Sequence, residues 1–115
     1  MPFRLTPNGP AEPRFAPADP DLRAALLAAV KAEAARRILA TAPEWKQRNA
    51  TARAVELIRK GESAWTPDEV AESAAIDLLW SRVKAIRAAS DHMEAGLVAA
   101  APEALGSFDI GAGWP

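Results

Sequence analysis

The side chain in this 115-residue chain with the widest chemical use is its one histidine, His92. Asp91 and Glu94 stand beside it, and a histidine near carboxylates can contribute to a metal site. The spacings of a helical zinc motif and of a calcium-binding loop are absent, and Ser90 lies two residues away, on a different face of a helix. We interpret His92 as a helical surface residue. The sequence predicts no catalytic, metal-binding or cofactor-binding site, so we do not expect an enzyme.

A second group of residues could bind phosphates. Basic side chains cluster in the first half of the chain, with Trp45 and Asn49 among them, and such a surface can hold a nucleic-acid backbone and stack a base. The candidate basic face consists of Arg36, Arg37, Lys46, Arg48 and Arg53. The formal net charge of −1 and the isoelectric point near 5.8 disfavour nucleic acid as the partner, because domains that bind it are usually basic.

Charge is divided unequally between the two halves of the chain. Residues 20–60 contain nine Lys or Arg and four Asp or Glu, whereas residues 61–105 contain three and eight. These opposite balances predict that the halves pack on each other, within one chain or between copies. The alternative is that the basic half faces an acidic partner.

The clearest periodicity is a seam of apolar residues whose spacing alternates between three and four. This 3.5-residue repeat is typical of a helix that buries a narrow stripe against another helix, and only Ser90 interrupts it. The predicted packing positions are Ile76, Leu79, Val83, Ile86, Met93 and Leu97. We expect either the first helix or other copies of the chain to cover them.

Capping signals place two helices in the first half. A helix is predicted over 20–40, and Thr41 with Glu44 matches a capping box that would begin a second helix over 43–60. Gly61 follows the two basic residues that end this second helix, as is common after a helix C-terminus. Its expected inward side chains are Trp45, Ala52, Val55 and Ile58.

A third, long helix is predicted over 66–97. Thr66 is a good capping residue, Pro67 suits the first helical position, and Glu69 completes a capping box. The short link at 61–65 is expected to turn this helix back along the second one. The predicted fold is therefore all-α, a three-helix antiparallel hairpin or bundle.

Two extended segments flank the helical domain at 20–97. Residues 1–19 contain five prolines, which fix φ and remove amide donors, so we expect an extended arm. Residues 98–115 form a flexible tail that contains glycine and proline and either folds back on the helices or docks on a partner. The apolar side chains predicted to contact partners from these arms are Phe3, Phe15, Phe108 and Trp114.

Composition restricts the cellular setting. The chain has no cysteine, and no apolar run approaches the roughly 18 residues that span a bilayer. The first residues lack the apolar core of a signal peptide. We expect a protein that is made in the cytoplasm and has no membrane partner.

Three blocks of sequence resemble a known group of proteins. They are Ala-Glu-Ala-Ala-Arg-Arg-Ile at 32–38, Pro-Glu-Trp-Lys-Gln-Arg-Asn at 43–49 and Trp-Ser-Arg-Val-Lys-Ala-Ile-Arg-Ala-Ala-Ser-Asp at 80–91. With the Gly-Glu-x-x-Trp-Thr link they resemble small α-helical proteins encoded in the tail and fibre gene modules of tailed phages, prophages and gene transfer agents of proteobacteria. The resemblance implies a virion component or assembly factor near fibres or spikes. It offers no catalytic residues to carry over.

The residues and the resemblance together predict an oligomeric structural adaptor at the base of a spike or fibre of a phage-like particle. Its expected partners are other copies of itself, a capsid or tail protein, and a fibre or spike protein. A fibre or tail assembly chaperone that is absent from the finished particle needs the same features and remains open. A small nucleic-acid-binding regulator that uses the basic helices is the third alternative.

Overall fold

The computed structural model describes residues 20–115, which are mostly helical and contain no strand. The elements, in chain order, are α1 (Pro20–Thr41), α2 (Glu44–Lys60), the short 3-10 helix η1 (Glu62–Ala64), α3 (Pro67–Ala99) and the 3-10 helix η2 (Pro102–Ser107). The predicted all-α class is confirmed. The ends of the three long helices lie within two residues of the positions expected from proline and capping signals.

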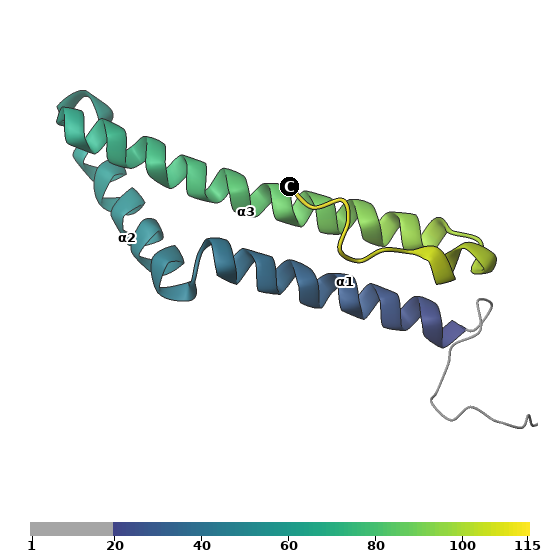
Figure 1. Cartoon of the computed structure of the whole chain (residues 1–115). Coiled ribbons are helices and arrows are strands. Elements are labelled where there is room, and N and C mark those ends of the chain that lie inside the picture. The colour runs from purple at the N-terminus through teal and green to yellow at the C-terminus, as the bar shows by residue number, and fades with distance from the viewer. Residues whose placement is uncertain (1–19) are drawn as a thin grey trace, which may run out of the picture.

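The long helix α3 serves as the common support for the other two (Figure 1). Its 33 residues correspond to about 50 Å at 1.5 Å per residue. After α2 the chain turns back, so that α2 lies beside the N-terminal part of α3 and α1 beside its C-terminal part (Figure 1). The chain bends between α1 and α2, and the two form an elbow against α3.

One apolar cluster lies where α1 meets the C-terminal part of α3. Its buried members are Val30, Met93, Leu97 and Leu105. The residues after α3 run back between α1 and α3 and end beside α3 (Figure 1), and they add a further layer to this cluster. Their contributions come from Phe108, Ile110 and Trp114.

A second apolar cluster lies at the elbow. It consists of the buried residues Ala42, Ala50, Leu79 and Val83, with the partly buried Ile38, Ile76 and Trp80 packed against them. Two of its four buried members are alanines, whose small side chains fill little volume. No residue after α3 contributes to this cluster.

The elbow begins without the side-chain cap that the sequence predicted. Thr41 is the last residue of α1, and Pro43 stands at the N-cap of α2 with no side-chain hydrogen bond. The proline disfavours helical geometry in the residue before it, so the break falls at Ala42. The amide of Ala42 still donates to the carbonyl oxygen of Ile38 (2.7 Å). The side-chain amide of Gln47 donates to the carbonyl of Ala42 (2.7 Å), which satisfies that end of α1.

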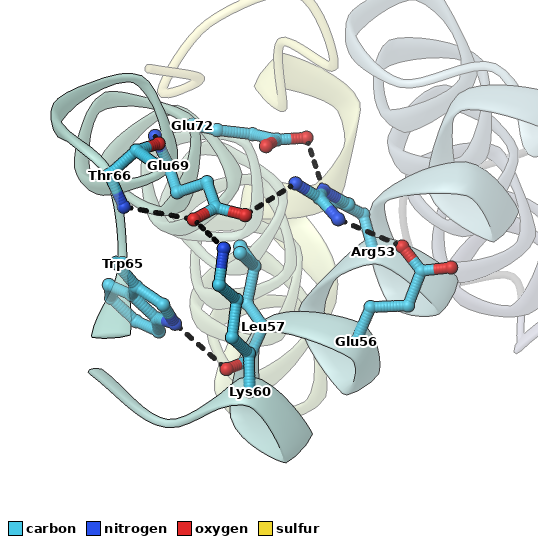
Figure 2. Close-up of polar contacts among 8 residues, drawn as sticks. All are labelled: Arg53, Glu56, Leu57, Lys60, Trp65, Thr66, Glu69 and Glu72. Carbon is cyan, nitrogen blue, oxygen red and sulfur yellow. Dashed lines mark hydrogen bonds and ion pairs between the residues drawn. The ribbon is translucent and has the colours of Figure 1, made fainter. Parts of the chain in front are cut away.

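The predicted capping box of α3 is confirmed (Figure 2). The amide of Glu69 donates to the Thr66 hydroxyl oxygen (3.2 Å), and the amide of Thr66 donates to the Glu69 carboxylate (2.9 Å). These two bonds satisfy backbone donors that no earlier turn can pair.

Side chains from α1 hold the other end of α3 and the tail beyond it. Arg23 donates to the carbonyl oxygens of Leu97 and Ala100 at the C-terminus of α3. The Arg37 guanidinium lies 5.0 Å from the centre of the Trp114 ring. Of the two arrangements expected for the tail, the structure places it folded back on the helices.

Candidate functional site

The predicted seam lies inside the chain. Leu79, Val83, Ile86, Met93 and Leu97 are buried, and Ile76 is partly buried. In the two apolar clusters, seam residues pack against residues of α1 and α2 of the same chain. The chain's own helices therefore cover the seam. Surfaces for a partner must therefore be sought elsewhere.

Ser90 interrupts the seam without leaving its hydroxyl unsatisfied. The side chain is buried, and its hydroxyl donates to the carboxylate of Glu94 (2.9 Å). Lys31 of α1 forms an ion pair with the same carboxylate. These bonds, the Lys31 pair first, lower the pKa of Glu94. The polar interruption thus connects α1 to α3.

The orientation predicted for α2 is wrong. Trp45, Val55 and Ile58 were expected to point inward, but Trp45 is 59% exposed and Ile58 75% exposed, and Ala52 is exposed as well. The buried side chains of α2 are instead Ala50 and Leu57. We call the surface of Trp45, Ala52, Val55 and Ile58 the outer face of α2.

Polar contacts beside Leu57 explain this rotation (Figure 2). Arg53 of α2 donates to the carboxylates of Glu72 (2.9 Å) and Glu69 (3.2 Å) of α3, and Lys60 lies 2.6 Å from Glu69. The indole of Trp65 donates to the carbonyl oxygen of Leu57 (2.8 Å). These contacts hold the Ala50 and Leu57 side of α2 against α3 and leave the bulkier apolar stripe outside.

An open groove of about 540 Å³ lies between α2 and α3 on the side of Arg53. Its apolar lining comes from α3 (Ala75, Ile76, Leu78 and Leu79) and from Ala50 of α2. Its polar lining is Lys46, Asn49, Arg53, Glu72 and Arg82. Leu78 is the large apolar side chain of this lining that is exposed, with 52% of its surface accessible.

The charges along the groove are only partly compensated. Arg53 contacts three carboxylates, those of Glu56, Glu69 and Glu72, and the hydrogen bonds that it donates to Glu72 and Glu56 raise its pKa. Lys46 and Arg82 form no ion pair within residues 20–115. The groove therefore combines an apolar surface with two uncompensated positive charges.

The Glu69 carboxylate of α3 helps to hold α2 against α3 beside this groove, through its contacts with Arg53 and Lys60. Its pKa is lowered to about 2, chiefly by the bond from Lys60 and then by the backbone amide of Thr66. It stays ionised under all ordinary conditions and joins the end of α2 to the start of α3. The contacts of Arg53 and Lys60 thus bring basic α2 against acidic α3, as the charge pattern predicted for halves that pack within one chain.

The predicted basic face does not form one positive surface. On α1, Arg36 and Arg37 both bind Glu33, and these bonds lower the pKa of that carboxyl to about 2. On α2, Arg48 lies 3.7 Å from Glu44, and Arg53 has the three carboxylates described above. Lys46 is the one member without a carboxylate partner in the described part of the chain, which weakens the case for a phosphate-binding face.

The arm residues predicted to contact partners have two outcomes. Phe108 and Trp114 are partly buried on the chain's own helices, against the cluster that contains Val30, Met93 and Leu97. Phe3 and Phe15 lie outside the residues that the structure describes.

The sequence patterns gave no prediction for Leu78 and Arg82, which both line the groove. Leu78 directly precedes the seam residue Leu79, so the paired leucines were a signal that the apolar surface of α3 extends beyond the seam. Arg82 lies four residues later, on the same side of the helix. Their relation to Lys46 depends on how α2 lies against α3.

His92 is exposed on α3, and residues 20–115 contain no group of three or more side chains that could hold a metal ion. Within the same residues, no helix has the length and apolar character needed to cross a bilayer. No protein-family model, curated protein or solved structure matches the chain.

Proposed function

We propose that the chain is an oligomeric structural adaptor of a phage-like particle, placed at the base of a spike or fibre. The observation that carries the proposal is the uncovered apolar surface at the α2 end of the molecule. Isolated exposed apolar side chains are ordinary, but here an apolar groove and the outer face occupy two sides of one helix. A helix with apolar surface on both sides suits a protein that joins others.

The two ends of the molecule differ in a way that supports this role. At the α1 end, the chain's own tail covers the cluster around Val30 and Leu97. At the α2 end, no segment within residues 20–115 adds a third layer to the elbow cluster. We assign the closed end to stability and the open end to assembly, within an antiparallel three-helix arrangement.

The three blocks that carry the resemblance meet at the elbow. Ile38 belongs to the first block, and Trp80 and Val83 belong to the third; all three pack in the elbow cluster, beside the break at Pro43 that begins the second. The resemblance therefore tracks the residues that shape the open end. This supports a shared structural role.

Copies of the chain are proposed to associate through the outer face of α2, because the seam is already occupied. Ile58→Glu at this face is expected to reduce the mass of the complex measured by sedimentation, since it would bury a charge at the contact. Val98→Glu is the matched control, because Val98 is also exposed (66%) but lies at the closed end. Equal masses for both variants and the unmodified chain would show that the outer face does not join copies.

The experiment that tests the adaptor role is a census of purified particles by mass spectrometry. Peptide counts for this chain are compared with those of the major capsid protein. Several copies per particle are the expected result, and the number would indicate the symmetry of the site. Absence from particles, with abundant protein in the lysate, would exclude the adaptor and leave the assembly chaperone, which can use the same open groove transiently.

A further inference from the structure

We propose that the groove between α2 and α3 binds an amphipathic helix of a partner protein that carries acidic residues beside its apolar face. This proposal rests on the adaptor function for the place where binding occurs, and it names the chemistry of the partner. The groove is the one defined above, with an apolar lining and two uncompensated cations.

The shape of the groove favours a helical occupant. It runs between two helices and opens to solvent, as do the grooves in which amphipathic helices dock. Ala50 and Ala75 face it with small side chains, which lets another backbone approach. Leu78 and Ile76 then offer apolar surface to anchors spaced by three or four residues.

The closed end of the molecule shows how such a site is filled. There, the tail lays Phe108 and Ile110 against α1 and α3, and this segment includes the acidic residue Asp109. In the described part of the chain, no segment covers the elbow cluster in the same way. A partner helix in the groove would give the α2 end the third layer that the tail gives the α1 end.

The charges of the groove select an acidic partner. The lining of the groove contains three cations, Lys46, Arg53 and Arg82, and one carboxylate, that of Glu72. Glu72 pairs with Arg53, so the positive charges of Lys46 and Arg82 are left for a partner. Carboxylates next to the partner's apolar anchors would pair with these cations. A basic helix would place like charges together, which opposes binding.

The same reasoning disfavours the chain itself as the occupant. The outer face of a second copy would bring Arg59, which forms no ion pair among residues 20–115, toward Lys46 and Arg82. The residues at 1–19 contain two arginines and two acidic residues, so they carry no excess of negative charge. The tail is already packed at the closed end.

The test is a selection from an unbiased displayed library of helical peptides against the full chain, followed by binding measurements with the enriched peptides. We expect enriched sequences to be acidic, with apolar residues spaced by three and four. Lys46→Glu with Arg82→Glu should weaken their binding by about tenfold or more at low salt, and Leu78→Asp should do the same. Lys84→Glu with Arg87→Glu is the matched charge control, and Val98→Asp is the control for Leu78→Asp. Circular dichroism verifies that each variant is folded.

Three results would overturn the proposal. They are a selection that enriches no binder, enrichment of neutral or basic peptides, and binding that the groove variants leave unchanged. A dimer of the chain that Leu78→Asp dissociates would show instead that the groove is an interface between copies. The particle census is independent of this selection, so failure of the groove and failure of the adaptor role are distinguished.

Discussion

Val83 offers the sharpest test of how the helices pack. It has no exposed surface and lies in the elbow cluster with Ala42, Ala50 and Leu79. Val83→Ala removes two buried methyl groups and leaves a cavity, at a cost of about 1–3 kcal/mol. The better helix propensity of alanine returns about 0.5 kcal/mol. We therefore expect a net loss of about 1.5 kcal/mol in the free energy of unfolding, within a range of about 0.5–2.5 kcal/mol.

The matched control is Val98→Ala on the same helix. Val98 is exposed, so its replacement gives the same gain in propensity with no cavity. The assay is thermal and urea unfolding followed by far-ultraviolet circular dichroism. A loss of about 1.5 kcal/mol corresponds to a fall of about 6–12 °C in Tm for a domain of this size. Val98→Ala is expected to leave Tm unchanged or slightly higher.

Two results would refute the reasoning. If Val83→Ala and Val98→Ala were equally stable, Val83 would not be in a packed interior. If Val83→Ala reduced the size of an oligomer and left the unfolding of the monomer unchanged, the seam would join copies of the chain. Sedimentation at several protein concentrations distinguishes this second case.

Three further predictions concern the start of α3, its C-terminal end and the tail that follows it. The pKa of Glu69 is lowered from 4.5 to about 2 in the folded chain. Its contribution to stability is therefore complete above about pH 4.5 and is lost as the pH falls toward 2. Urea unfolding across this range should show a shallower pH dependence of the free energy of unfolding for Glu69→Gln than for the unmodified chain. Arg23→Met should lower the free energy of unfolding by about 1–3 kcal/mol, because the hydrogen bonds to the carbonyls that end α3 are lost. Arg87→Met is the control, because Arg87 is exposed on α3 and has no ion pair among residues 20–115. It should change the free energy of unfolding little in the same urea titration. Gly113→Ala should loosen the tail, because Gly113 has a φ of 91° and an added Cβ would lie 2.8 Å from the Met93 side chain; faster hydrogen exchange in η2 and the tail is the expected readout, and unchanged exchange would contradict the packing described for them.

The sequence alone predicted the helices well because the signals that end a helix are local. Thr66 and Glu69 are three residues apart, and their reciprocal bonds need no other part of the chain. The proline at 43 breaks the helix wherever the rest of the chain lies. The Thr41 cap failed because the same proline moved the break to Ala42, one residue past the expected cap.

The rotation of α2 and the position of the tail depended on contacts between distant residues. Apolar side chains occur on more than one side of α2, so periodicity could not select the buried side. The bonds from Arg53 to Glu69 and Glu72 cross from one helix to another, and they favour the side with Ala50. In the same way, Arg37 meets Trp114 only after the chain has turned back.

The sequence by itself therefore determined the all-α class, the helix ends and the residues of the seam, because each depends on neighbours within a few positions along one helix. The tertiary structure alone decided what covers the seam, which side of α2 remains exposed and where the groove lies. Lys46 and Arg82 are on different helices and border one groove only because α2 packs with its alanine side against α3. Such a juxtaposition depends on the balance of packing and ion pairs over the whole fold, which no local pattern records.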